Sequence, residues 1–346
     1  MQLGIEYYTK KRPHVVILGA GASCAAIPHG DKFGKKISAM NGFIDKLGLS
    51  DIIANIDFHT SSNNLEDMYM ELDDRSHTDH NCQVAKNALE NRIYSYMSSF
   101  RIPDFPTVYD FLLLSLTSKD LVATFNWDPL LVQSYLRIMK FTDNLPEMVF
   151  LHGNVAIGYC ENDNTIGNIG TVCKCGKPLK PIQLLYPIKK KDYSSETAIA
   201  KSWKTLQNAM KAAYMVTIFG YSAPKSDVAA ISMLKSAWGK PEERNLEEIE
   251  IIDLRSEDDL KPSWEEFIYS HHYSCHKSFF DSTLGTFPRR SCEAFFDMVM
   301  GCRFLNGEMG FSPKMSFSDI YNLIHPLLSD EQNKKGKKLI LNNPYV

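Results

Sequence analysis

The sequence predicts an α/β fold, in which a parallel β-sheet carries helices on both faces. Short apolar runs rich in β-branched residues alternate with helix-like segments, and nearly every run ends in a glycine or a polar residue. This alternation is typical of parallel sheets, whose strands are buried on both faces. The composition agrees, because 44% hydrophobic and 23% charged residues are the mix of a globular protein.

Five strands follow from these runs. The first is HVVIL at 14–18, and the others are expected at 120–125, 148–151, 214–219 and 249–254. Residues from about 35 to 118 predict a helical insertion after the first strand. Residues of about 158–181 are rich in Gly, Asn, Cys and Pro and predict a small irregular insertion. The expected fold class is therefore Rossmann-like.

Two regions are expected along the chain. Residues 1–260 would form the nucleotide-binding domain with both insertions. Residues 261–346 would form a small, aromatic-rich and mostly helical C-terminal region.

Charge and hydropathy exclude several functional classes. The net charge of −3 provides no overall basic field for nucleic acid. No apolar run approaches the roughly 20 residues of a membrane span, and the start of the chain shows no secretory signal. We therefore expect a cytoplasmic protein, in which eight cysteines are not a disulfide framework.

Ligand-binding residues are expected beyond the carboxyl ends of the strands. The first such loop holds Gly19, Ala20, Gly21 and Ser23, between a strand and a helix. Glycine allows a pyrophosphate to approach the backbone closely, and a helix N-terminus offers free N–H groups. The alternative is a tight turn without a ligand, or Ser23 as a helix cap.

The next two loops also carry polar residues. Asn126 and Asp128 follow the second strand, and both residue types are also common helix caps. His152 follows the third strand and suits proton transfer near neutral pH, although a lone histidine is more often structural.

The last two strands end similarly. Gly220 and Ser222 follow the fourth strand, with Asp227 after them. Asp253 ends the fifth strand, where a carboxylate either accepts hydrogen bonds from ribose hydroxyls or caps the strand end.

The order of these motifs resembles the sirtuin family over roughly residues 13–256. It is most similar to the divergent sirtuin-like domains of bacterial antiphage defence. That resemblance implies NAD as substrate and attack on the anomeric carbon of the nicotinamide ribose. It also implies individual roles: the pyrophosphate at Gly19, Ala20, Gly21 and Ser23, catalysis by Asn126, Asp128 and the base His152, adenosine at Gly220 and Ser222, and the adenine ribose at Asp253.

One departure from the family bears on the reaction. Sirtuin deacylases follow the glycine turn with a run of Gly-Ile-Pro-Asp-Phe-Arg type. Here Ile27-Pro28 remains, but the following residues up to Phe33 lack that order and its arginine. Deacylation is therefore disfavoured, whereas hydrolysis of NAD by water needs no peptide groove.

Three cysteines provide a second resemblance, to the zinc knuckle that follows the histidine motif in sirtuins. Cys160, Cys173 and Cys175 are the expected ligands, with Asp163 as a fourth. Structural zinc sites need four ligands, and a C-x-C step is unusual in them. The alternative is a degenerate knuckle held by packing.

Two other groups contain histidine and cysteine. We interpret His77, Asp79, His80 and Cys82 as part of a solvated loop. His271, His272, Cys275 and His276 are interpreted as packing on an aromatic helix.

Taken together, these features predict an NAD hydrolase that yields ADP-ribose and nicotinamide, as a regulated effector of antiphage defence. Because a free NAD hydrolase would harm its own cell, we expect restraint by homo-oligomerisation or by a separate sensor such as a DNA-translocating ATPase. The alternatives are an NAD-dependent protein deacylase and a module that senses NAD or ADP-ribose without turnover.

Overall fold

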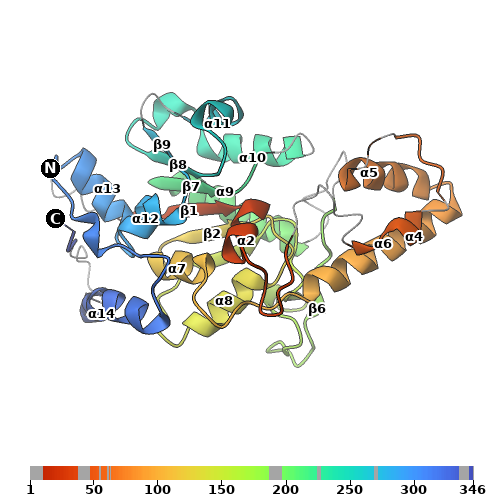
Figure 1. The fold of residues 1–346 in the computed structure, drawn as a ribbon, viewed down its shortest axis with the longest axis horizontal. Coiled ribbons are helices and arrows are strands. Elements are labelled where there is room, and N and C mark those ends of the chain that lie inside the picture. The colour runs from red at the N-terminus through yellow and green to blue at the C-terminus, as the bar shows by residue number, and fades with distance from the viewer. Residues whose placement is uncertain are drawn as a thin grey trace.

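The centre of the molecule is a six-stranded parallel sheet in the order β3-β2-β1-β7-β8-β9 (Figure 1). The structure is a computed structural model that describes residues 11–37, 47–53, 56–60, 62, 64–186, 197–223, 227–268, 272–334 and 343–345. The strands are β1 (His14–Leu18), β2 (Leu121–Thr124), β3 (Glu147–Phe150), β7 (Met215–Phe219), β8 (Glu248–Ile252) and β9 (Tyr273–His276). The strand order reverses between β1 and β7, as in dinucleotide-binding sheets. The predicted Rossmann-like class is confirmed.

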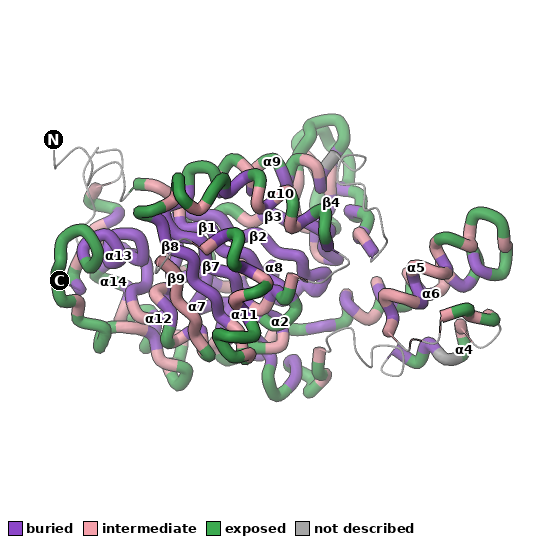
Figure 2. The backbone as a smooth tube through the Cα atoms, turned by 90° about the horizontal axis from the view of Figure 1, so that it is seen from above, coloured by how far each residue is buried: buried purple, intermediate pink, exposed green. Residues whose placement is uncertain are grey.

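Alternate residues of the strands face two separate hydrophobic cores. Val16, Leu18 and Val122 pack with α2 (Ala20–Ala26), α7 (Val108–Ser115) and α8 (Leu130–Ile138). Val15, Ile17 and Ala123 pack with α9 (Thr197–Ala212), α10 (Val228–Trp238) and α11 (Glu257–Trp264). Figure 2 shows the strands buried between helices that expose their outer sides.

The expected helical insertion projects from the sheet domain as an arm (Figure 1). It contains α4 (Ser50–Ile53), α5 (Leu65–Ser76) and α6 (His80–Ser98). The stretch from residue 59 is polar and shows little apolar periodicity in the sequence, yet it contains α5. Leu65, Met68 and Leu72 share one buried helix face, a spacing that the many acidic neighbours obscure. Asp79 caps α6 by accepting from the N–H of Asn81. The group of His77, Asp79, His80 and Cys82, which was expected in a solvated loop, therefore spans the start of this helix.

The small insertion expected at about residues 158–181 contains a second, antiparallel sheet of short strands. Its order is β5 (Thr165–Asn168), β4 (Ile157–Cys160) and β6 (Lys180–Pro181). The strands are only two to four residues long, β5 is only partly buried and β6 is exposed. Runs this short leave no apolar alternation in the sequence, so the small insertion was predicted but its strands were not.

The C-terminal region contributes the sixth strand of the large sheet. β9 pairs in parallel with β8, and Cys275 lies opposite Ile251. An aromatic helix was expected at this position. The strand lies at the sheet edge, where it is only half-buried, and its residues SCH include no aliphatic side chain. The sheet therefore includes a strand from the part of the chain after residue 260.

Three helices follow β9 and cover one end of the sheet: α12 (Thr283–Thr286), α13 (Ser291–Val299) and α14 (Phe317–Lys334). Single 3-10 turns lie at Pro241–Glu243, Phe279–Asp281 and Gly307–Met309. Every helix in the described part of the chain is too short or too polar to span a membrane.

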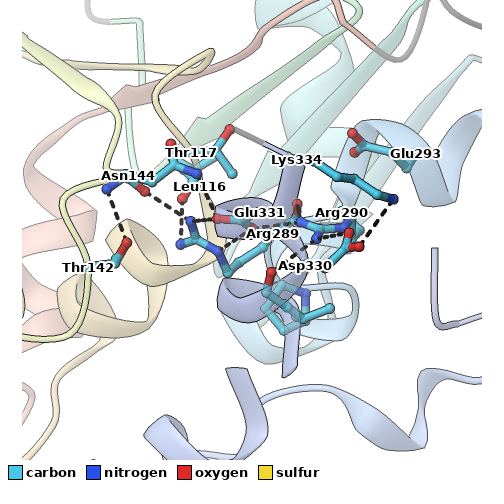
Figure 3. Close-up of polar contacts among 12 residues, drawn as sticks. Leu116, Thr117, Thr142, Asn144, Arg289, Arg290, Glu293, Asp330, Glu331 and Lys334 are labelled. Carbon is cyan, nitrogen blue, oxygen red and sulfur yellow. Dashed lines mark hydrogen bonds and ion pairs between the residues drawn. The ribbon is translucent and has the colours of Figure 1, made fainter. Parts of the chain in front are cut away.

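A buried cluster of charges attaches α14 to the sheet domain (Figure 3). The guanidinium groups of Arg289 and Arg290 are fully buried and both contact the carboxylate of Glu331. Arg289 also donates to the carbonyl oxygens of Leu116, at the end of α7, and Asn144. These bonds cross from the C-terminal region to the helix that precedes β2.

Candidate functional site

The register of the sheet places the predicted site loops at one height. Leu18 of β1 lies opposite Thr124 of β2 and Phe219 of β7, Thr124 lies opposite Phe150, and Phe219 lies opposite Ile252. The residues two positions further along are Ala20, Asn126, His152, Tyr221 and Leu254. Because parallel strands end at the same edge, these residues belong to one loop layer, centred on the β1–β7 reversal.

The glycines of the first loop are needed for contact with the loop after β7. Gly21 N–H donates to the Gly220 carbonyl at 2.9 Å, and Gly19 N–H donates to Phe219 at 3.0 Å. A Cβ at Gly19 would lie 2.5 Å from the Gly220 oxygen, and a Cβ at Gly21 would lie 2.8 Å from the Gly220 Cα. Packing between loops thus accounts for the glycines, while Ala20, Gly21 and Ser222 remain exposed to a ligand.

The side-chain amide of Asn126 is held by three acceptors. Its Nδ2 lies 2.8 Å from the Gly19 carbonyl, 2.9 Å from Ser23 Oγ and 3.2 Å from Tyr109 Oη. Ser23 is fully buried in the body of α2, so it does not cap that helix. It links the glycine turn to the loop after β2.

Asp128 lies on the same network. Ser23 Oγ donates to its Oδ2 at 2.6 Å, and the Leu130 N–H donates to its Oδ1 at 3.1 Å, which supports the start of α8. Burial raises the pKa of this carboxyl group, against the effect of both donors. Both oxygens are engaged by protein groups and the residue is only 3% exposed. This geometry suits positioning of Ser23 better than contact with a ligand.

His152 lies beside an aromatic stack. Its ring meets Phe125 edge-on at 4.8 Å between centroids, and Phe125 stacks on Tyr221 at 4.3 Å. Phe125 directly precedes Asn126 in the loop after β2. The ring of His152, in the loop after β3, therefore contacts the residue next to Asn126. Gly153 follows with φ +77°, and a Cβ there would lie 2.7 Å from the Gln183 carbonyl.

Asn154 and Tyr109 belong to the site but were missed in the sequence. Asn154 Nδ2 donates to the carbonyls of Asn126 and Asp128, at 3.1 and 2.7 Å, and so ties the loop after β3 to the loop after β2. Its place two residues after His152 was the available signal. Tyr109 lies in an apolar helix more than ten residues before β2, and no local pattern sets it apart.

Asp253 is already paired in this structure. Arg255 donates to it from Nε at 3.1 Å, from Nη2 at 2.9 Å and from its backbone N–H at 2.9 Å. Burial acts to raise the pKa of this carboxyl group, but the bonds from Arg255 outweigh it and lower the pKa. A ribose at this position would share the carboxylate with Arg255.

The segment that departs from the deacylase pattern has a structural role here. Asp31 Oδ1 accepts from the N–H groups of Phe33 and Lys35, both at 2.9 Å, and Oδ2 accepts from Arg101 N–H at 3.0 Å. The carboxylate therefore closes its own turn and holds the chain after α6. Both of its oxygens are bound to the backbone.

The knuckle cysteines converge at the end of the small sheet. One ligand atom from each of Cys160, Asp163, Cys173 and Cys175 lies within 4.8 Å of the others. The Cys160 and Cys175 sulfurs are 3.5 Å apart, and Cys173 Sγ lies 2.9 Å from Asp163 Oδ2. Tetrahedral zinc with Zn–S bonds of about 2.3 Å places its sulfurs about 3.8 Å apart, so the four groups fit a structural zinc ion.

No family model matches the chain, and neither does any curated protein. Similar solved structures include a complex of a Sir2 homologue with NAD, at 13% identity and a TM-score of 0.39, covering 87% of this chain and 93% of that chain. A mutant Sir2 homologue with ADP-ribose is 13% identical, with 95% and 98% covered and a TM-score of 0.38. Sir2 bound to an acetylated peptide is 14% identical, with 88% and 99% covered and a TM-score of 0.36. Values this low do not assign an activity.

Proposed function

We propose that the protein binds NAD at the carboxyl edge of the sheet and cleaves its nicotinamide–ribose bond with water. The observation that supports this most is the shared layer of Asn126 and His152 on neighbouring strands, beside the exposed start of α2. A fixed amide and an imidazole in one loop layer suit the hydrolysis of a dinucleotide, because one can orient the ribose or the water and the other can accept a proton.

Each loop would contact a different part of the bound NAD. The exposed backbone of Ala20 and Gly21 would meet the pyrophosphate, with Gly19 and Ser23 shaping the turn from beneath. Gly220 and the exposed Ser222 would line the adenosine side, and Asp253 with its partner Arg255 would meet the adenine ribose. Asn126 and His152 then lie toward the nicotinamide ribose, on the β2–β3 side of the reversal.

The reaction replaces one bond with another at the anomeric carbon. The bond to nicotinamide breaks as positive charge develops on the ribose, and the oxygen of water forms the new bond. His152 accepts the proton that water loses and passes it to solvent. Asn126 holds the ribose hydroxyls or the water in place. Nicotinamide, ADP-ribose and one proton are the products, and positioning supplies much of the acceleration.

Protein deacylation is the second candidate. It is disfavoured because the chain lacks the deacylase arginine after the glycine turn, and because Asp31 in that segment is committed to backbone groups. A deacylase would consume NAD only when an acylated peptide is present. A module that senses NAD or ADP-ribose would bind the nucleotide and leave it intact.

Nicotinamide release from purified protein and NAD distinguishes these functions. We expect release without peptide, reduced at least about a hundredfold in Asn126→Ala and in His152→Ala, since each removes one positioned catalytic group. Glu242→Gln is the control, because Glu242 is exposed in the 3-10 turn Pro241–Glu243 that precedes β8. Absence of release by every assembly of the wild-type chain, with NAD still bound, would favour the sensing module.

A cytoplasmic NAD hydrolase needs restraint, so we propose that the protein is a regulated effector of antiphage defence. Homo-oligomerisation or a separate sensor, such as a DNA-translocating ATPase, would switch it on. The support is the motif order and the physiological cost of unregulated NAD loss. Nicotinamide release measured across protein concentration, with light scattering of the same samples, tests whether activity follows assembly.

We further propose that Cys160, Cys173, Cys175 and Asp163 hold a zinc ion that fixes the small sheet. The ion would have no part in the reaction. Its four ligands close the turns between β4, β5 and β6, which bury little apolar surface of their own.

A further inference from the structure

We infer that Tyr109 is a positioning residue that locks the amide of Asn126 with its oxygen turned toward the nicotinamide ribose. The inference rests on the proposed NAD cleavage. It begins from a fully buried tyrosine of α7 whose hydroxyl reaches both Ser23 and Asn126, at 2.7 and 3.2 Å.

The direction of every hydrogen bond in this network follows from counting protons. Ser23 has one hydroxyl proton, and it is donated to Asp128 Oδ2. The bond between Ser23 and Tyr109 must then use the proton of the tyrosine. Tyr109 Oη is left as an acceptor, which the Asn126 amide fills. The chain runs from Asn126 to Tyr109 to Ser23 and ends on the carboxylate of Asp128.

The same count fixes which way the amide of Asn126 faces. Gly19 contributes a carbonyl oxygen, which accepts and never donates, so the amide nitrogen must lie on its side. The three acceptors Gly19, Ser23 and Tyr109 lie on one side of the amide, and the two protons of Nδ2 are donated to them. The nitrogen therefore stays on that side. Because the amide is planar, its oxygen lies on the other arm. Asn126 therefore offers the ribose an acceptor.

The tyrosine keeps its proton under all conditions in which the enzyme would work. Burial raises the pKa of Tyr109 well above its ordinary value, and the nearby charge of Asp128 raises it further, although Ser23 and Asn126 act in the opposite sense. The hydroxyl thus acts as a fixed relay of one proton. Its effect on the reaction passes through Asn126 and not through the substrate.

Tyr109→Phe tests the assignment, with Tyr214→Phe as a matched control. Tyr214 is also fully buried, but its hydroxyl has no hydrogen-bond partner among the described residues, and it precedes β7 at the other end of the sheet. We expect kcat for nicotinamide release to fall about tenfold in Tyr109→Phe, with KM within about twofold of wild type. Tyr214→Phe should match wild type in both.

A second readout is independent of turnover. In protein labelled with ¹⁵N-asparagine, the Asn126 side-chain NH₂ signal is identified by its loss in Asn126→Asp. We expect its protons to exchange with water about tenfold faster in Tyr109→Phe than in wild type or Tyr214→Phe, because the proton shared by Ser23 and Tyr109 keeps only one of its two acceptors. If Tyr109→Phe does not fold, Tyr109→Met removes the same hydroxyl and leaves the Gly19 and Ser23 acceptors of Asn126 in place.

The outcomes separate this inference from the proposed function. Unchanged exchange in a folded Tyr109→Phe overturns the assignment, and so does a rise in KM with kcat unchanged, which would mean direct contact with NAD. If the wild type releases no nicotinamide, the proposed hydrolysis fails. The exchange measurement then still decides whether Tyr109 locks the amide.

Discussion

Replacement of Glu331 by Gln should cost a large share of the stability of this protein. The Arg289 Nε lies 2.7 Å from one oxygen of the Glu331 carboxylate, and Arg290 Nη1 lies 2.8 Å from the same oxygen (Figure 3). Both arginine side chains are fully buried. Burial acts to raise the pKa of Glu331, but the two guanidinium groups outweigh it and hold the pKa below its usual range. One carboxylate therefore neutralises much of the charge of two buried cations.

The magnitude follows from what the substitution leaves behind. Removing one member of a buried ion pair costs about 3–5 kcal/mol, because the remaining charge keeps its desolvation penalty without a partner. Total stabilities of about 5–15 kcal/mol are usual, so the loss is a large fraction. Gln keeps the size and one acceptor oxygen, so a cavity does not contribute.

Equilibrium unfolding in urea, followed by tryptophan fluorescence, measures this effect. Asp330→Asn is the matched control, since Asp330 is partly exposed and lies 3.4 Å from Arg290, and we expect less than about 1 kcal/mol there. A Glu331→Gln midpoint equal to that of Asp330→Asn would refute the reasoning. It would mean that water reaches the arginines and that the cluster does not hold α14 in place.

Three further predictions concern the loops, the pH dependence and the metal. Gly19→Ala should lower the free energy of unfolding by about 1–3 kcal/mol and weaken NAD binding, since the new Cβ meets the Gly220 backbone; an unchanged free energy of unfolding would contradict the loop contact. Burial lowers the pKa of His14 to about 4, so the folded state binds fewer protons than the unfolded chain and stability is lost as pH falls from 6.5 toward 4. Between pH 7 and 5 this amounts to roughly 2 kcal/mol, measured as the difference in urea midpoints between wild type and His14→Gln, and an equal slope in both would count against it. Metal analysis should find about one zinc per chain, lost in Cys173→Ser together with several degrees of thermal stability, whereas Cys302→Ser should keep both.

The parallel sheet was predictable because its first five strands are buried on both faces. Runs such as HVVIL need no partner to be recognised as strands, and their order along the chain allowed the site loops to be placed at one edge. The sixth strand was not predictable in this way. β9 lies at the edge, and its side chains serve polar contacts, such as that of His276 Nε2 with Glu250 Oε1 at 3.4 Å, in place of an aliphatic core.

The site was predictable only where function and strand ends coincide in sequence. Asn126 and His152 could be found because each follows a strand by two residues. The roles of Ser23 and Asp128 were harder to predict, because a sequence does not show whether a polar side chain faces a ligand or another side chain. Here Ser23 Oγ donates to Asp128 Oδ2 at 2.6 Å, so the two side chains are engaged by each other. Tyr109 reaches the site through the packing of α7, and this has no signature in the sequence.

The position of Tyr109 in turn depends on how firmly α7 is held. Thr107 N–H donates to Asp110 Oδ2 at 2.6 Å, and this bond caps the N-terminus of α7. The other oxygen of Asp110 accepts from Ser134 and Arg137 of α8, at 2.8 and 2.6 Å, and Asp110 is fully buried. α8 itself begins at the loop of Asn126. Two helices that flank the amide are therefore joined to each other by one buried carboxylate, so the distance from the tyrosine hydroxyl to the amide is set by rigid elements. The helical arm lies before α7 in the chain, and none of these bonds involves it. The arm is linked instead to the loop after β3, where Tyr94 Oη of α6 donates to the Val155 carbonyl at 3.4 Å.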